Sequence, residues 1–144
     1  MKIFKAEQWN IEVLAPLFEA YRLANGMSEN PDRTLTFLTN RMRFNESMFF
    51  IAVNENAQAI VFVQLYPRFS SLQLQRYWQL TDIFVKEDKQ QAEIYAALIS
   101  KAKEFVRYTQ SNRLVAELSQ GQQSILEREG FKLNTKKSLF ELTL

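Results

Sequence analysis

One segment of this sequence, residues 81–106, has a pattern that could bind an anion. They predict a strand that runs through a short polar turn into a long helix, whose first turn would present free backbone N–H groups to a phosphate. Phosphate-binding turns usually contain glycine, because glycine lets the backbone approach the anion. This turn has none, since Glu93 and Tyr95 stand where small residues would serve. The segment is therefore either an altered phosphate site or a junction that never bound one.

Two residue types that carry much of enzyme chemistry are missing altogether. The chain has no Cys, which excludes a thiolate nucleophile, a disulfide framework and a thiolate metal site. It has no His either, which excludes a Ser-His-Asp arrangement and His-ligated zinc. Any acid–base chemistry must come from Asp, Glu, Tyr, Lys or a bound water.

Length and charge narrow the class of protein further. A chain of 144 residues predicts a single domain spanning 1–144. The net charge of +2 and the short basic cluster Lys136–Lys137 argue against a nucleic-acid partner. No apolar run approaches the ~20 residues that span a bilayer, and the first ten residues lack the core of a secretion signal. We therefore expect no membrane partner and a cytoplasmic location.

Hydrophobic periodicity predicts the elements that would position such a site. Spacings of three and four residues indicate helices, and alternating or β-branched runs indicate strands, with the third strand long enough to bend or bulge midway. Asn30 and Pro31 are typical of a helix start. The order is β-α-α-β-β-β-α-β-α-β-β, a mixed α/β arrangement with helices on both faces of a sheet. The helices are expected at 8–25, from 31, 89–109 and 122–129, and the strands at 1–6, 48–53, 59–66, 72–85, 113–118, 131–133 and 138–144.

Several strings in this order resemble the GNAT acetyltransferase superfamily. They are LAPLFEAYR, FVQLYPRFSS, LTDIFV and LEREGFK, and together they cover nearly the whole chain. The resemblance implies an α/β (α+β) fold with a mixed, mostly antiparallel central sheet of six to seven strands, flanked by about four helices.

The resemblance also implies acetyl-CoA as cofactor. In the family, pantetheine lies in the gap between the strands that match LTDIFV and RLVAEL, so backbone groups of Ile83, Phe84 and Val85 would bind it. The pyrophosphate binds a motif of the form R/Q-x-x-G-x-G/A. Its counterpart here comprises Gln90, Gln91, Ala92, Glu93, Ile94 and Tyr95.

Only the first position of that motif is kept. Gln90 satisfies it, whereas Glu93 and Tyr95 replace both small residues. A like-charge pair at ~4 Å costs about 1 kcal/mol in high dielectric, and a tyrosine ring adds bulk. We therefore expect impaired acetyl-CoA binding.

The catalytic residue that the resemblance implies is Asp82, which would receive a proton from an amine directly or through water. The alternative is a carboxylate that accepts backbone N–H groups at a bulge. Many relatives also carry a proton-donating tyrosine four residues before the glycine that ends the last helix. Here that position is Leu126, counted back from Gly130.

The acceptor site is expected to involve Tyr66, Phe69 and Trp78, with Tyr21 and Arg22 reaching it from the first helix. The alternative for the aromatic residues is the hydrophobic core, and for Arg22 a solvated salt bridge. Two functions remain open. One is acetyl transfer from acetyl-CoA to the primary amine of a small molecule or protein. The other is an inactive GNAT-fold module that binds a small molecule or a protein. Apolar terminal strands often pair across dimers in this fold, so a homodimer is possible.

Overall fold

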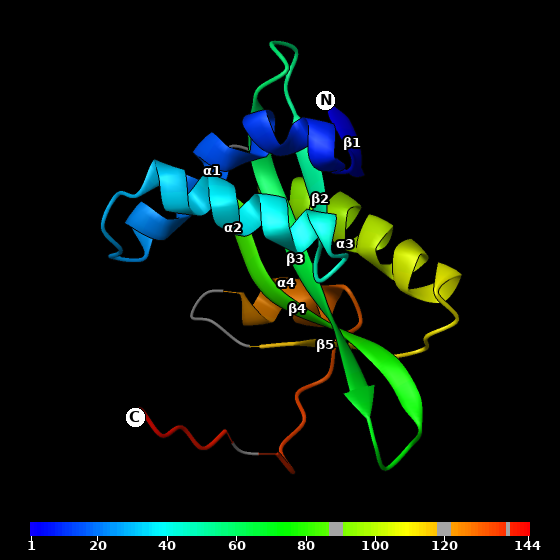
Figure 1. Cartoon of the computed structure of the whole chain (residues 1–144). Coiled ribbons are helices and arrows are strands. Elements are labelled where there is room, and N and C mark those ends of the chain that lie inside the picture. Colours follow the sequence, from blue (N-terminus) through cyan, green and yellow to red (C-terminus); the bar gives the residue numbers. More distant parts are fainter. Residues whose placement is uncertain (87–90, 118–121, 138) are drawn as a thin grey trace.

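The computed structural model describes residues 1–86, 91–117, 122–137 and 139–144, and of Gln91 only the backbone. Helices α1 and α2 lie together on one side of a twisted sheet, and α3 lies on the other (Figure 1). In chain order the elements are β1 (Lys2–Lys5), the 3₁₀ turn η1 (Gln8–Asn10), α1 (Ile11–Ala24), α2 (Pro31–Arg43), β2 (Met48–Val53), β3 (Ala59–Ser70), β4 (Gln75–Val85), α3 (Gln91–Tyr108), β5 (Leu114–Ala116) and α4 (Gln123–Arg128).

The sheet has the order β1-β2-β3-β4-β5. Its first four strands pair antiparallel, and β5 joins β4 in parallel after the crossover through α3. The predicted mixed, mostly antiparallel sheet is therefore confirmed. The predicted count of six to seven strands is too high, because residues 131–133 and 139–144 form no strand in the described chain. The backbone of these residues pairs with none of the five strands, and Phe140 is 92% exposed.

The β3–β4 hairpin is longer than the sequence predicted. We expected Pro67 to end β3, but the strand continues through it to Ser70, opposite Gln75. Proline is tolerated there because β2 pairs with β3 only as far as Leu65, so beyond that residue one edge of β3 is free. The hairpin consequently projects beyond the rest of the sheet (Figure 1).

Each face of the sheet has its own hydrophobic core. On one face the apolar stripe of α1 packs on β2 and β3, with Leu14, Phe18 and Phe62 buried. On the other face Leu98 and Ala102 of α3 are fully buried against the sheet. Burial of these stripes explains why the helices cover opposite faces, since apolar surface removed from water stabilises the fold by roughly 25 cal/mol per Å².

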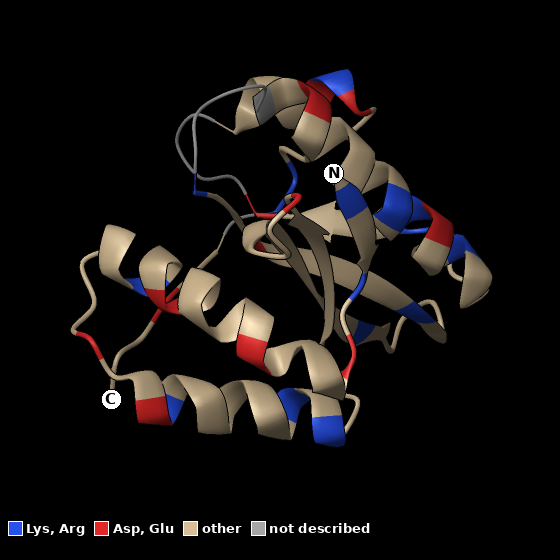
Figure 2. Ribbon diagram, turned by 90° about the horizontal axis from the view of Figure 1, so that it is seen from above, with Lys and Arg blue, Asp and Glu red and all other residues tan. Residues whose placement is uncertain are grey.

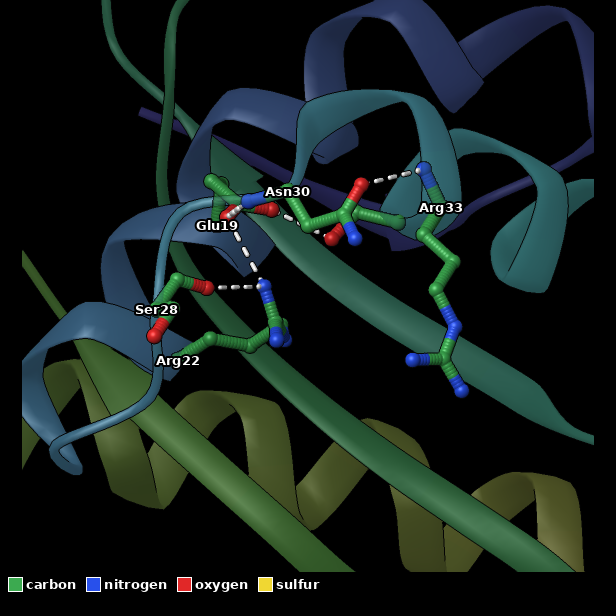
Figure 3. Close-up of polar contacts among 6 residues, drawn as sticks. Glu19, Arg22, Ser28, Asn30 and Arg33 are labelled. Carbon is green, nitrogen blue, oxygen red and sulfur yellow. Dashed lines mark hydrogen bonds and ion pairs between the residues drawn. The ribbon is translucent and has the colours of Figure 1, made fainter.

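A buried carboxylate holds the start of α2 against α1. Glu19 accepts hydrogen bonds from the Asn30 backbone N–H at 2.8 Å, from the Thr34 hydroxyl and from Arg22 Nη1 at 2.8 Å. These donors lower the pKa of Glu19, the Thr34 hydroxyl most and the Asn30 N–H next. The Arg22 guanidinium also donates to the Ser28 carbonyl at 3.1 Å, which ties the connecting loop to α1 (Figure 3).

The charged residues are distributed without separation by sign. Acidic and basic positions are interspersed along the helices (Figure 2), in keeping with the small net charge of +2. Across the described ranges, none of the helices combines the length and the apolar character needed to cross a membrane.

Candidate active site

A β-bulge in β4 sets the direction of the candidate catalytic carboxylate. Gln64 pairs with Asp82 and Leu65 pairs with Leu80, so Thr81 is the extra residue between them. Trp78 and Leu80 face the α3 core before the bulge. With strict alternation Asp82 would follow them onto that face. The extra residue instead turns Asp82 toward α1, where it contacts a tyrosine. The predicted midway irregularity of this strand is confirmed.

The residue that meets the carboxylate is Tyr21 of α1. Its hydroxyl donates to Asp82 Oδ1 at 2.6 Å, a short distance typical of a hydrogen bond to an ionised acceptor. The Tyr21 ring packs edge-on against Phe62, with centroids 5.3 Å apart, and lies 5.6 Å from Phe84. Burial, together with the bonded Asp82 carboxylate, raises the pKa of Tyr21 well above its usual value of 10.0. Tyr21 is thus a neutral hydrogen-bond donor at physiological pH.

A second tyrosine, Tyr66 of β3, lies on the same face of the sheet as Asp82. Gln64 Nε2 donates to the Tyr66 hydroxyl at 2.8 Å and to Ser47 Oγ at 3.0 Å. Ser47 in turn donates to the Leu65 carbonyl at 2.9 Å. Burial raises the pKa of Tyr66, and the negative charge of Asp82 adds to this effect. Gln64 lies opposite Asp82 in the pairing of β3 with β4, so the Gln64–Tyr66 hydrogen bond places Tyr66 in the same polar cluster as Asp82.

Two members of this cluster, Gln64 and Ser47, were not predicted from the sequence. Gln64 is 1% exposed, and its side-chain amide donates to both Ser47 and Tyr66. One signal was available in the sequence: Gln64 is an isolated amide in the otherwise apolar and aromatic run VFVQLY. A polar side chain at a core position of a central strand is retained only where partners satisfy it.

Three of the predicted acceptor residues lie outside this cluster. Trp78 is buried on the opposite face, where its Nε1 donates to Thr109 Oγ1 at 2.9 Å. Phe69 is 70% exposed on the projecting hairpin. Arg22 is directed to Glu19 and the α1–α2 loop (Figure 3). The structure thus brings Tyr21, Tyr66 and Asp82 together but not the other three.

The gap expected between β4 and β5 is supported by the strand pairing. Within the described residues β5 pairs with β4 only at Trp78–Leu80, so Ile83, Phe84 and Val85 extend beyond its last partner. Among the described residues, none pairs with Ile83–Val85 on the side of β4 that faces β5. A narrow pocket opens beside it, lined by Leu80, Ile83, Tyr95, Ile99, Glu117, Gln122, Ile125 and Leu126.

The residues that match the phosphate motif are only partly described. Gln90 and the side chain of Gln91 lie outside the described residues. At the start of α3, Ala92 is partly buried, Glu93 is exposed, and Ile94 and Tyr95 are buried at 6% and 8% exposure. Tyr95 lines the pocket beside β4, which places a large ring at the end of the gap nearest the start of α3.

The late helix contributes an apolar wall to the same pocket. Leu126 of α4 is 6% exposed and lines the pocket together with Ile125. The position where many relatives carry a proton-donating tyrosine is therefore occupied by a buried aliphatic side chain. The described lining contains no tyrosine except Tyr95.

Comparison with known proteins identifies the class. No protein-family model matches the chain. A probable acetyltransferase of Haemophilus influenzae is 78% identical over 144 residues, which cover 100% of this chain and 99% of that protein. The uncharacterized N-acetyltransferase YhfO of Bacillus subtilis is 30% identical over 138 residues, covering 94% of this chain and 92% of that protein.

Solved structures give the same result. The crystal structure of a probable acetyltransferase matches 100% of this chain and 98% of its own, with 33% identity and a TM-score of 0.91. A predicted acetyltransferase from Clostridium acetobutylicum, solved with acetyl-CoA, shares the fold at 14% identity, with a TM-score of 0.78 over 97% of this chain and 95% of its own. The chain is an acetyltransferase by class. Within that class it belongs to the GNAT superfamily.

Proposed function

We propose that the chain transfers an acetyl group from acetyl-CoA to a primary amine of a small molecule or protein, and that Asp82 accepts the proton. The observation that supports this role is the 2.6 Å hydrogen bond from Tyr21, which fixes the Asp82 carboxylate beside the free part of β4. A carboxylate held in a fixed position beside the acceptor can receive a proton from an incoming amine.

Each step of the transfer has a candidate group in the chain. Acetyl-CoA, when bound, would supply the thioester carbonyl that the amine attacks. The backbone of Ile83–Val85 would pair with the amide groups of the cofactor and hold the carbonyl in position. Asp82 would take the proton from the amine nitrogen as the new C–N bond forms and the C–S bond of the thioester breaks, which would release coenzyme A as the thiolate. Tyr21 would keep the carboxylate oriented, and the Tyr66 hydroxyl would border the acceptor.

An activity assay with a matched control tests the role of Asp82. Thiol release from acetyl-CoA would be measured against a panel of amines that includes polyamines, peptides with free N-termini and aminoglycosides. Aminoglycosides belong in the panel because two structures with the same fold are aminoglycoside acetyltransferases. We expect Asp82→Asn to lower kcat/KM by about 100-fold, the lower end of the usual contribution of a general base. Asp32→Asn, an exposed site on α2, should leave it unchanged. Equal activity of the two variants would refute the assignment.

We further propose that acetyl-CoA binds more weakly than is usual for the fold. Glu93 is exposed in the first turn of α3, where its charge would lie near the diphosphate, and Tyr95 adds bulk beside the gap. By calorimetry, Glu93→Gly should tighten binding about fivefold, which corresponds to removal of about 1 kcal/mol of repulsion. The double change Glu93→Gly, Tyr95→Gly should tighten it further in the fraction that folds.

The control for this experiment lies on the same helix. Glu104→Gly carries the same helix penalty of about 1 kcal/mol, but Glu104 lies about three turns away from the phosphate position. The affinity of the Glu104→Gly variant for acetyl-CoA should match that of the unmodified chain. Tight binding by the unmodified chain would contradict the proposal of a weakened phosphate site.

The second candidate function is a GNAT-fold module that binds a ligand without transferring acetyl groups. The observation that favours it is the combination of Glu93, Tyr95 and Leu126 at positions where the family handles the cofactor. It predicts no thiol release with any amine of the panel, and no acetyl-CoA binding even by the Glu93→Gly variant. Turnover that depends on Asp82 would exclude it. For either function we expect a cytoplasmic location.

A further inference from the structure

Arg41, near the end of α2, carries a positive charge whose donors are largely unused. Its Nη2 donates to Glu46 Oε1 at 3.1 Å, and in the described chain this is the only hydrogen bond that the guanidinium makes. Its Nε is buried without a partner among the described residues. The guanidinium carbon lies 4.7 Å from the centroid of the Phe37 ring, which supports it from one side. A guanidinium has five N–H donors, so the fold holds this one in place with most of its hydrogen-bonding capacity left over.

The connection after α2 places Arg41 beside the polar cluster of the candidate active site. Glu46 binds Arg41 twice, through its carboxylate and through its backbone N–H, which donates to the Arg41 carbonyl at 2.9 Å. The next residue is Ser47, whose hydroxyl accepts from Gln64 Nε2 at 3.0 Å. Gln64 also donates to the Tyr66 hydroxyl at 2.8 Å. In keeping with this position, burial raises the pKa of Tyr66 most, whereas the positive charge of Arg41 lowers it.

The cluster and Arg41 together offer both kinds of group that a zwitterion needs. The Tyr66 hydroxyl accepts from Gln64, and in the described part of the chain its own proton has no acceptor. The Tyr66 hydroxyl and the Arg41 guanidinium are therefore two donors that an anionic group could occupy. Asp82, which lies opposite Gln64 in the strand pairing, is an acceptor suited to an amine. The side chain of Arg41 is 25% exposed, so a small ligand can reach it.

We propose that the acceptor is a small primary amine that also carries a carboxylate, and that Arg41 determines this specificity by binding the carboxylate. The inference rests on the proposed acetyl transfer, in which Asp82 receives the proton of the amine. The acceptor would bridge the cluster, with its nitrogen at Asp82 and its carboxylate at Arg41 and the Tyr66 hydroxyl. A carboxylate suits the site better than a phosphate dianion does, because Glu46 already neutralises part of the charge of Arg41 and the Asp82 carboxylate is a second negative charge in the site.

Binding measured without acetyl transfer tests this specificity directly. The full chain, alone and with coenzyme A, would be titrated by NMR with glycine, β-alanine, γ-aminobutyrate and ε-aminocaproate, and with the carboxamide of each. The carboxamide keeps the amine and the shape of the acid but removes its negative charge. In the pair that binds best we expect the acid to bind about tenfold more tightly than its carboxamide, since hydrogen bonds to charged groups are the stronger ones.

The variants attribute this preference to one side chain. In Arg41→Gln the acid and its carboxamide should bind about equally, and Arg41→Lys, which keeps the charge but not the planar donors, should retain part of the preference. Arg43→Gln is the matched control, because Arg43 is exposed on the same helix and lies over the ring of Phe44 instead, so the preference should persist. The proposal would be overturned if none of the four acids bound, if acids and carboxamides bound equally to the wild type, or if Arg41→Gln kept the full preference. Tighter binding of ethanolamine phosphate than of every acid would overturn the choice of a carboxylate.

Thiol release from acetyl-CoA with the same compounds separates failure of this inference from failure of the proposed function. Arg41→Gln should raise the KM for the acid and change kcat much less, because the contact to the carboxylate is made in the ground state and the transition state alike. Binding of the acids through Arg41 without thiol release from any amine would refute acetyl transfer and leave Arg41 as a carboxylate-binding residue. Thiol release at equal kcat/KM with acids and carboxamides would support acetyl transfer and refute the role of Arg41.

Discussion

The hydrogen bond between Tyr21 and Asp82 gives the sharpest quantitative prediction. Tyr21→Phe removes the hydroxyl that donates at 2.6 Å and keeps the ring contacts with Phe62 and Phe84. A hydrogen bond to a charged group contributes about 1.5–3 kcal/mol. Because both partners are only partly buried, we expect the lower value, about 1.5 kcal/mol. For a chain of this length that loss corresponds to a Tm lowered by about 3–6 °C.

A double-mutant cycle isolates this interaction from other effects of the substitutions. The free energy of unfolding would be measured by urea denaturation at pH 7 for the wild type, Tyr21→Phe, Asp82→Asn and the double variant. The amide introduced by Asp82→Asn could still accept a hydrogen bond, so the cycle reports the charge-dependent part, for which we expect a coupling of about 1 kcal/mol. A coupling below about 0.5 kcal/mol, the usual limit for independent sites, would refute the claim that Tyr21 holds the Asp82 carboxylate in place.

The raised pKa of Tyr21 makes the same interaction visible at alkaline pH. Since the folded pKa lies above the unfolded value of 10.0, the neutral hydroxyl contributes stability that is fully present below pH 10 and is lost as the pH rises through the folded pKa. The wild type should therefore lose more stability above pH 10 than Tyr21→Phe does. Tyr108→Phe, at an 85% exposed position, should follow the wild type. If the wild type and both variants lose stability in parallel, the titration of Tyr21 is not the cause of the pH dependence.

Substitutions at three further positions test the elements that support the site. Glu19→Gln should destabilise the chain at pH 7, and the difference from the wild type should shrink below pH 4.5, because the lowered pKa of Glu19 confers stability that is lost as the carboxylate protonates. Denaturation at pH 7 and at a pH of about 3.5 measures this, and a constant difference would contradict it. Asn30→Ala should cost about 1 kcal/mol through loss of the cap on α2, whereas Asn30→Ser should cost much less. Trp78→Phe should cost about 2 kcal/mol, because it leaves a cavity and removes the bond to Thr109, and a value below about 0.5 kcal/mol would contradict the core placement of Trp78.

Much of the fold was predictable because local chemistry and tertiary packing agree. The helix start at Asn30 and Pro31 follows from capping chemistry, and the structure confirms the Asn30 cap. The apolar spacings in α1 and α3 correspond to the buried stripes on the two faces of the sheet. In each case the pattern of a few neighbouring residues was enough to predict the element, because the tertiary contacts of that element agree with the pattern.

The features that were missed depend on residues far apart in the sequence. An alternating pattern such as that of residues 139–144 indicates a strand but carries no information about the strand it will pair with. The site presents the same difficulty. A bulge at Thr81 turns Asp82 to the face opposite Trp78, and one extra residue in the register decides this. Tyr66 and Asp82 could be predicted as candidates, but their grouping with Gln64 required the observed pairing of β3 with β4.

The acceptor half and the cofactor half of the candidate active site differ in how closely they match what the family resemblance implies. This difference separates the two proposed functions. The acceptor half retains a carboxylate with a dedicated donor, since Tyr21 bonds Asp82 across 61 residues of sequence. Of the changes that should harm function, Glu93 and Tyr95 lie where the cofactor phosphates would bind, whereas Leu126 lies where many relatives carry a proton-donating tyrosine. Loss of binding energy remote from the chemistry raises KM when it affects ground state and transition state equally. We therefore expect Glu93 and Tyr95 to raise the KM for acetyl-CoA without themselves lowering kcat. An inactive binding module would instead show no turnover at any concentration of acetyl-CoA, because a higher concentration of the cofactor cannot restore a missing catalytic step.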